Sequence, residues 1–404
     1  MSGISRSVFA FLASLAIAGL ISSSFDVLAQ DKDKKKVVTK DKKEASKDKK
    51  EDKDKKEDKK EEKKEPPFKP DPAHLEFKHV EKEKTFWVFA VAFGADGKTV
   101  AASYRDHSVK IWDINAKKDV QTIKGKASAD TRGLADFKGL LYIKNQLAVG
   151  TGHWDIKKKE RKGEIQLFDA MAAKPGKPLQ GHSQDVVELA VSKDGKFVAS
   201  ASEDKTVIIW DFAEGKAVQT IKGHTDTVTS VAFSPDGKQV VTSSLDKTLR
   251  VWDIAAAKEI ASFKVEREVE VKDPKSKDPK KPAMIKTKES GREFTHAVFT
   301  SDGKKIVAGN LDGIVKIYDV DGKKELKEVK AHDGVLALAI SPDGTNFATG
   351  GWDKIIKVWN TADGKELRSI KAHMDTVSTL SFSPDGQWLA SGSNDGTVKI
   401  WSVK

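Results

Sequence analysis

The stretch GHTDTVTSVAFSPDGKQVVTSSLDKTLRVWD, residues 223–253, decides the fold. Within it, VTSVAF and TLRVWD are rich in β-branched and aromatic residues, which favours strands. SPDGK predicts a hairpin turn, because Pro235 fixes its own φ and Gly237 accepts a positive φ. A second tight turn is expected at Asp246 and Lys247, and the following KEIASFK supplies a fourth strand. Each such unit therefore predicts a small antiparallel sheet.

The same unit recurs along the chain at a nearly fixed spacing. GHSQDVVELAVSKDGKFVASASEDKTVIIWD precedes it, and AHMDTVSTLSFSPDGQWLASGSNDGTVKIW lies near the C-terminus. Trp210 and Trp252 are 42 residues apart, as are Trp359 and Trp401. A period of about 40–45 residues with these dipeptides is typical of one four-stranded propeller blade. We count seven units, of which the second has its third strand at EIQLFD. The other six carry an Asp-Gly turn, at Asp96, Asp194, Asp236, Asp302, Asp343 and Asp385.

From about residue 74 onward, the repeats resemble those of the WD40 family. The resemblance implies an all-β fold, a seven-bladed β-propeller of four-stranded antiparallel blades. The last unit stops after its third strand, at Trp401 and Ser402, which would leave an open sheet edge. HLEFKHV, residues 74–80, alternates as a strand does, so we expect this N-terminal strand to join the last blade and close the ring.

Four units contain a His, a Ser or Thr, an Asp and a Trp, which together could suggest a catalytic triad. The resemblance implies a buried hydrogen-bond relay instead, and a buried polar group without a partner costs about 1–3 kcal/mol. Recurrence in one ring also argues against catalysis, so we assign no catalytic residue. The first unit lacks the His, and Phe168 and Tyr318 replace the Trp of the second and fifth units. The expected structural relay consists of His182, Ser200, Asp204 and Trp210; His224, Thr242, Asp246 and Trp252; His332, Thr349, Asp353 and Trp359; and His373, Ser391, Asp395 and Trp401.

A partner is expected at the end of the ring that bears the loop before each first strand and the turn between each second and third strand. WD40 relatives commonly bind peptides there. Grouped exposed aromatic residues usually mark an interaction site, and the alternative is that they pack over the central channel. Two Lys-rich insertions, residues 153–163 and 265–290, should emerge at the same end, the second as a hairpin. The predicted partner-binding residues are Trp87, Phe89, Arg105, Trp154, Leu245, Leu311, Leu336 and Trp352.

These features predict a non-catalytic scaffold that binds protein or peptide partners, favouring acidic or extended ones, as a monomeric propeller. The alternatives are a lactonase-like propeller enzyme and a charge-driven binder of anionic surfaces or nucleic acid. The chain has no cysteine, and its remaining histidines show no metal-ligand spacing, so we expect no metal and no cofactor. Of the net charge of +11, the propeller carries about +6, which is modest for nucleic-acid binding.

The N-terminus has two further segments. Residues 1–29 have the pattern of a cleavable signal peptide, because the apolar run of 8–21 is shorter than the roughly 20 residues of a spanning helix. Residues 30–73 form a Lys-, Asp- and Glu-rich tail with a Pro-rich boundary, expected to be a disordered spacer rather than a nucleic-acid-binding arm. We therefore expect an exported protein, periplasmic or extracellular, with the propeller at residues 74–404.

Overall fold

The computed structural model of the chain describes residues 71–78, 80–81, 84–124, 139–155, 158–272 and 284–403. The chain divides into two units, Met1–Lys69 and Pro70–Lys404, and every described residue belongs to the second. The expected signal peptide and most of the charged tail lie outside the described residues, so both remain predictions. Over the described ranges, no helix has the length and apolar character needed to cross a bilayer.

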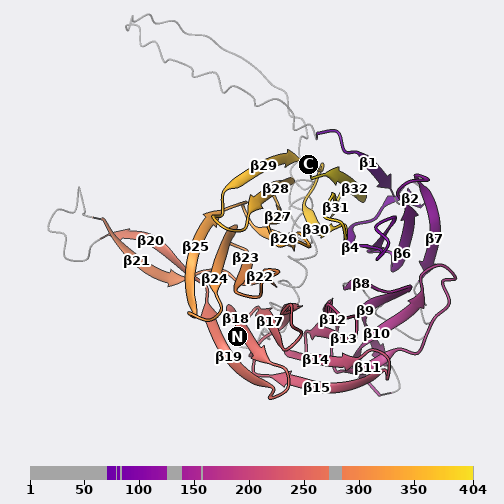
Figure 1. The fold of residues 1–404 in the computed structure, drawn as a ribbon, viewed down its shortest axis with the longest axis horizontal. Helices are drawn as coiled ribbons and strands as arrows, with labels where there is room; N and C mark the ends of the chain where they lie inside the picture. The colour runs from indigo at the N-terminus through magenta and orange to yellow at the C-terminus, as the bar shows by residue number, and fades with distance from the viewer. Residues whose placement is uncertain are drawn as a thin grey trace, which may run out of the picture. The chain divides into compact units, whose positions relative to one another are not determined.

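Seven four-stranded antiparallel sheets, the blades, are arranged in a ring (Figure 1). Blades 1 to 3 contain β4 (Val88–Phe93), β5 (Thr99–Tyr104), β6 (Ser108–Asp113) and β7 (Lys118–Lys124); β8 (Leu140–Ile143), β9 (Gln146–Asp155), β10 (Glu160–Asp169) and β11 (Leu179–His182); and β12 (Val186–Val191), β13 (Phe197–Ser202), β14 (Thr206–Asp211) and β15 (Lys216–Lys222). Blades 4 and 5 contain β16 (Val228–Phe233), β17 (Gln239–Ser244), β18 (Thr248–Asp253) and β19 (Lys258–Lys264); and β22 (Phe294–Phe299), β23 (Lys305–Asn310), β24 (Ile314–Asp319) and β25 (Lys324–Lys330). Blade 6 contains β26 (Val335–Ile340), β27 (Asn346–Gly351), β28 (Ile355–Asn360) and β29 (Glu366–Lys371). The predicted fold class and the count of seven blades are confirmed.

Blade 7 is closed by the N-terminal strand, as expected. It contains β30 (Val377–Phe382), β31 (Trp388–Ser393) and β32 (Thr397–Ser402), and its fourth strand is β1 (Leu75–Lys78). β1 runs antiparallel to β32, with Leu75 opposite Ile400 and Phe77 opposite Val398. The Phe77 ring also stacks on Trp112 of blade 1, with ring centroids 5.2 Å apart. The closing strand therefore connects the last blade to the first.

The hydrophobic core is divided among the blade interfaces. The described residues form seven clusters of buried apolar side chains, and each cluster draws on two adjacent blades. The cluster between blades 7 and 1 contains Val88, Trp112, Val398 and Ile400. A strand exposes successive side chains on opposite faces of its sheet. Because each sheet is covered by a neighbour on both faces, both sets of side chains can be buried.

We call the first strand of each blade its inner strand. Around part of the ring, the inner strands of neighbouring blades are hydrogen-bonded to one another. In six blades the pairing of the first two strands shifts register after the first residue of the inner strand. In three of these blades the residue at the shift is a Thr or Ser that donates to the next inner strand. The donations are Thr229 to the Phe294 carbonyl (3.1 Å), Thr295 to the Val335 carbonyl (2.9 Å) and Ser378 to the Val88 carbonyl (2.7 Å).

An ion pair between the third and fourth strands recurs in five blades. A basic residue of the third strand contacts an acid of the fourth in blades 1, 4, 5 and 6, and in blade 7 the acid is Glu76 of β1. Glu76, from the N-terminal part of the chain, therefore supplies the carboxylate that comes from the blade's own fourth strand in the other four blades. The pairs are Lys110–Asp119 (3.6 Å), Arg250–Glu259 (2.9 Å), Lys316–Glu325 (2.9 Å), Lys357–Glu366 (3.1 Å) and Lys399–Glu76 (3.4 Å).

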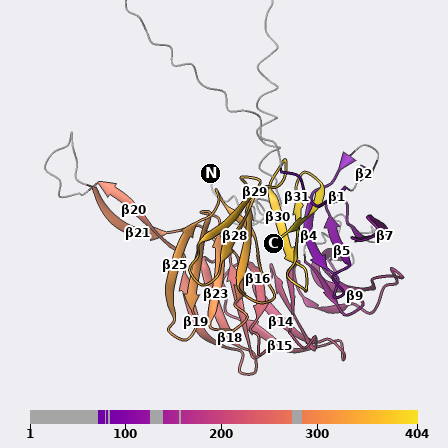
Figure 2. The same cartoon turned by 45° about the horizontal axis from the view of Figure 1, so that its top comes forward.

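Both Lys-rich insertions contribute regular structure. Between blades 4 and 5, β20 (Glu266–Lys272) and β21 (Met284–Ser290) form a separate two-stranded hairpin that projects from the rim of the ring (Figures 1 and 2). In blade 2, β9 and β10 are each ten residues long and pair along their whole length. A small pair, β2 (Val80–Glu81) and β3 (Lys84–Thr85), precedes blade 1.

Candidate functional site

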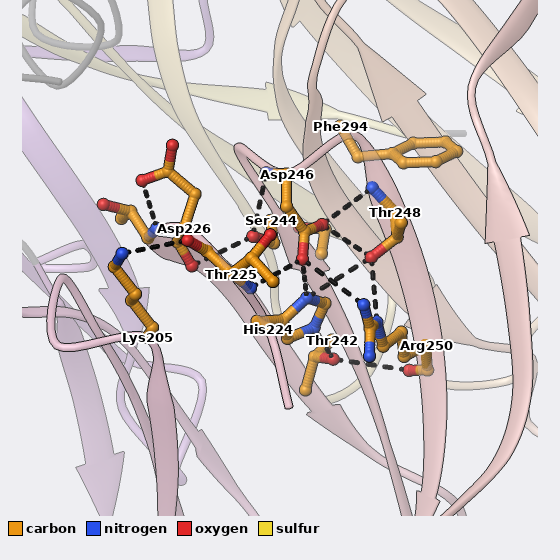
Figure 3. Close-up of polar contacts among 12 residues, drawn as sticks. Lys205, His224, Thr225, Asp226, Thr242, Ser244, Asp246, Thr248, Arg250 and Phe294 are labelled. Atoms are coloured by element: carbon orange, nitrogen blue, oxygen red, sulfur yellow. Dashed lines mark hydrogen bonds and ion pairs between the residues drawn. The ribbon is translucent and has the colours of Figure 1, made fainter. Parts of the chain in front are cut away.

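The polar quartet of blade 4 forms a continuous hydrogen-bonded chain, and Figure 3 shows three of its members, His224, Thr242 and Asp246. The Trp252 indole N–H donates to Thr242 Oγ1 (2.9 Å), and Thr242 Oγ1 lies 2.7 Å from His224 Nε2. On the other side of the imidazole, His224 Nδ1 lies 2.8 Å from Asp246 Oδ2. If Nδ1 carries the imidazole proton, Thr242 donates to His224 and His224 donates to Asp246, so each group has a partner.

Burial decides what this quartet can do chemically. Thr242 is 0% exposed and already accepts the Trp252 N–H. A hydroxyl that acts as a nucleophile must reach a substrate atom, and this one has no open approach. The Asp246 carboxylate also accepts the Thr225 N–H (3.0 Å) and the Thr248 hydroxyl (2.6 Å), which fixes the loop before the inner strand to the sheet. The quartet is therefore a structural brace.

The same chain of contacts is present in the three other blades for which it was predicted. In each, His Nε2 lies 2.7 Å from a Ser or Thr oxygen that is 0% exposed, and a Trp N–H donates to that oxygen at 2.8–2.9 Å. The contacts from His Nδ1 to the Asp carboxylate are His182–Asp204 (2.8 Å), His332–Asp353 (2.8 Å) and His373–Asp395 (3.2 Å).

Three relay carboxylates, those of Asp204, Asp246 and Asp395, are held in the ionised form. Burial by itself raises the pKa of Asp204, but the hydrogen bond and charge of His182 and the Thr206 hydroxyl outweigh it and lower the pKa to about 2. The pKa values of Asp246 and Asp395 are lowered in the same way, against burial, by their relay histidines and a neighbouring Thr. Near neutral pH each of these three relays therefore contains an ionised carboxylate.

Blade 5 lacks the complete quartet, and one of its buried polar groups has no hydrogen-bond partner in the part of the chain that the structure describes. Ala308 replaces the relay hydroxyl, and the buried Tyr318 replaces the Trp. The Tyr318 hydroxyl is buried with no hydrogen-bond partner among the described residues. The Tyr318 ring instead packs on Phe263, with centroids 4.4 Å apart. This blade relies on apolar packing where blades 3, 4, 6 and 7 use the relay.

We call one end of the ring the loop face: the loops before the inner strands together with the turns between second and third strands. A recurring hydrogen bond shows that both lie at the same end. In blade 1 the Arg105 N–H donates to the Trp87 carbonyl (3.0 Å), and Asn394 donates in the same way to Thr376 in blade 7 (3.1 Å). The blades share one strand order, so these loops and turns all emerge on one side of the ring.

The structure separates the predicted partner-binding residues into three groups. Arg105 is exposed, and Trp87, Phe89 and Trp352 are half-buried on the loop face. The side chain of Trp154, in β9, lies outside the described residues. The three leucines are buried instead of exposed, with Leu245 at 9%, Leu311 at 3% and Leu336 at 2%. Because these side chains are buried within the protein, the expectation that they offer partner-binding area is corrected.

A salt bridge holds the long β9–β10 arm of blade 2 against blade 3. The Arg161 guanidinium binds both carboxylate oxygens of Asp185, and the Asp185 side chain is 1% exposed. Gly152 makes this approach possible, because a Cβ there would collide with the Asp185 carboxylate. Arg161 pairs with Trp154 close to the turn of the arm, so the salt bridge fixes the outer part of the arm. Lys158 and Lys159 are exposed in the turn.

Sequence reasoning missed Arg292 and Met374 on the loop face. Arg292 lies two residues before its inner strand, where blades 4, 6 and 7 have Asp226, Asp333 and Asp375. This inversion of charge at one repeat position was the available signal. Met374 is 55% exposed in the corresponding loop of blade 7.

Two ionisable residues on inner strands, each half-buried but with a buried polar atom, were also missed. Burial raises the pKa of Glu188, in β12, to about 7, although hydrogen bonds from the Ser230 hydroxyl and the Val231 N–H oppose the shift. Burial lowers the pKa of His296, in β22, to about 4. Glu188 Oε2 and His296 Nδ1 have no hydrogen-bond partner among the described residues. The described ranges contain no group of three or more His, Asp or Glu side chains placed to hold a metal ion.

Comparison with known proteins agrees with this geometry. The family model "WD domain, G-beta repeat" (WD40) matches six segments that together cover more than half of the chain: residues 76–113, 173–211, 215–253, 287–319, 323–360 and 364–402. Blade 2 gives no separate match over β8 to β10. This blade carries the long arm and, like blades 1 and 5, lacks the complete quartet.

Several curated proteins are similar over part of the chain. A LEC14B homolog of Prunus armeniaca is 28% identical over 138 residues, covering 34% of this chain and 27% of the relative. Nuclear distribution protein nudF of Aspergillus terreus is 29% identical over 145 residues, covering 33% and 32%. Mitochondrial division protein 1 of Kluyveromyces lactis is 31% identical over 123 residues, covering 30% and 16%. The chain thus spans a third or less of the length of these relatives, all three of which are eukaryotic.

Proposed function

Because the chain belongs to the WD40 family, we propose that it is a non-catalytic scaffold that binds protein partners on its loop face. Propellers of this family are typically protein-interaction scaffolds, and the similar proteins include nudF and the LEC14B homolog. The relay quartets are buried inside blades, so binding falls to the loops that they brace.

The observation that carries the proposal is the grouping of partly exposed aromatic side chains at one end of the ring. Trp87 and Phe89 of blade 1 and Trp352 of blade 6 are half-buried there. Each large aromatic side chain buries much area at little entropic cost when a partner covers it. The hydrogen bond from the Arg105 N–H to the Trp87 carbonyl restrains the loop of blade 1, and the relay through Asp353 restrains the turn that carries Trp352. Such restraint before binding lowers the entropy lost on association.

Quantitative affinity capture tests the proposal. We expect the double variant Trp87→Ala with Trp352→Ala to recover at least about ten-fold less of the partners captured by the wild-type protein, as for loss of interface hot spots. The matched control is Phe197→Ala, because Phe197 is a half-buried aromatic residue at the opposite end of blade 3. Capture that is equal for the double variant and the wild type would refute binding through the loop face.

A further inference from the structure

Two arginines of the loop face stack on tryptophans. Arg105 Cζ lies 4.2 Å from the centroid of the Trp87 ring, and Arg292 Cζ lies 5.3 Å from that of Trp352. Neither guanidinium forms an ion pair with any residue that the structure describes. Arg161 and Arg250, in contrast, pair with acids of the protein. The two stacked arginines are thus cations without an ion-pair partner in the part of the chain that the structure describes.

Stacking prepares a guanidinium for a ligand. Contact between its flat face and an indole fixes the plane of the group and leaves its N–H edges directed away from the ring. Arg105 and Arg292 are both exposed, and Arg292 uses one N–H group for the Leu311 carbonyl (3.3 Å). A guanidinium has five N–H donors, so donors remain for a carboxylate, which it can bind through two parallel hydrogen bonds.

Several acids in the loops and turns of blades 5 to 7 accept hydrogen bonds within the protein. Asp353 and Asp395 accept from relay histidines, and Asp375 accepts the Thr376 N–H (2.6 Å). Asp312 accepts the backbone N–H of Arg292 (2.6 Å). Asp333 is an exposed exception, and it directly precedes Gly334, against which the Trp352 ring packs.

An apolar side chain lies between the two stacked pairs in ring order. Arg292 and Trp352 belong to blades 5 and 6, and Arg105 and Trp87 to blade 1. Blade 7 separates the pairs, and its loop presents Met374. That loop is fixed to the turn of blade 6 by the Ala372 N–H, which donates to the Lys354 carbonyl (3.1 Å). We call this set of five residues, Arg292, Trp352, Met374, Arg105 and Trp87, the arginine–methionine arc.

We propose that the arginine–methionine arc binds an extended acidic peptide segment. Two carboxylates of the segment bind the guanidiniums of Arg292 and Arg105, and an apolar side chain between them packs on Met374, whose flexible thioether adapts to different shapes. The inference rests on the proposed function, since it names the chemistry of the partner that the loop face receives.

A purified binding assay tests this directly. The probe is a fluorescein-labelled peptide with two glutamate clusters separated by a leucine-containing linker, titrated with the full chain and followed by anisotropy. The double variant Arg105→Gln with Arg292→Gln should weaken binding at least about ten-fold, as expected for loss of two charge-assisted contacts. Arg368→Gln is the control. Arg368 is exposed on β29, outside the arginine–methionine arc, so this substitution removes one positive charge without changing the arc. Asp333→Asn should strengthen binding by removing the exposed acid.

Three outcomes would overturn the inference. The first is unchanged binding by the double arginine variant when its circular dichroism matches that of the wild type. The second is equal loss in Arg368→Gln, which would indicate nonspecific attraction. The third is binding of single-stranded DNA but not of the glutamate peptide. If the peptide does not bind but partner capture still depends on Trp87 and Trp352, this inference fails and the proposed function stands.

Discussion

At the scale of single residues, the sequence places polar groups where burial makes hydrogen bonding obligatory. The relay hydroxyl is the centre of each quartet, because it serves the Trp N–H and the imidazole together. Blade 5 lacks this centre and leaves the Tyr318 hydroxyl without a partner among the described residues. Blades 4 and 5 of the same ring therefore provide a matched comparison.

Thr242→Val should destabilise the protein, and Tyr318→Phe should not. Valine keeps the shape of threonine but leaves the Trp252 N–H and His224 Nε2 unpaired, so we expect a loss of about 2–4 kcal/mol. Tyr318→Phe removes an unpaired buried hydroxyl and should change stability by about 0–1 kcal/mol, in the stabilising direction. Urea unfolding measures both, and equal destabilisation by the two substitutions would contradict the difference between the blades.

Glu188 should make the protein less stable as the pH rises. Its folded pKa of about 7 exceeds the ordinary value of 4.5, so the folded state binds more protons between these values. Stability from this group is present below about pH 4.5 and falls as the pH rises to about 7, by about 2–3 kcal/mol in total. Glu188→Gln should remove this fall and leave the variant more stable than the wild type at pH 8.

Thermal unfolding of the wild type and Glu188→Gln at pH 5 and pH 8 measures this effect. His296, whose pKa burial lowers to about 4, contributes in the opposite sense, since its stability is lost as the pH falls from about 6.5 toward 4. Its contribution is common to both proteins, so the difference between them isolates Glu188. Parallel pH profiles would show that Glu188 does not titrate in this range.

At the scale of elements, two sets of contacts connect strands from different blades or from distant parts of the chain. The first is made by the closing strand β1, which supplies Glu76 to Lys399 and Phe77 to Trp112. The second is the contact of the β9–β10 arm with blade 3 through Arg161 and Asp185. In both contacts an ion pair with one buried side chain holds a strand in position. The closing strand β1 adds the contact between Phe77 and Trp112.

Phe77→Ala should weaken the closure of the ring. The Phe77 side chain is 7% exposed and packs between blades 7 and 1, so we expect a loss of about 3–4 kcal/mol, as for other truncations of buried phenylalanine. Lys78→Ala, in the same strand, changes an exposed side chain and should cost less than about 1 kcal/mol. Differential scanning calorimetry compares the two, and a small effect of Phe77→Ala would mean that β1 is dispensable for closure.

At the scale of the whole molecule, the ring converts a local repeat into one shared surface. Each blade buries both faces of its sheet against neighbours, which leaves the loops at the two ends and the outer strands for contact with other molecules. The loop face then combines side chains from several blades. Arg292 of blade 5 lies on Trp352 of blade 6, and Met374 of blade 7 separates this pair from Arg105 and Trp87 of blade 1.

The sequence by itself determined the number of blades, the closing strand and the relay quartets. The number of blades follows from the repetition of one unit, and the closing strand follows from a last unit that stops after its third strand. The relay quartets were implied by the resemblance to the WD40 family, at positions that recur from unit to unit. Only the tertiary structure decided that Leu245, Leu311 and Leu336 are buried and that Arg292 stacks on a tryptophan of the next blade. Those outcomes depend on how adjacent sheets meet, and the pattern within a single repeat contains no information about its neighbour's side chains.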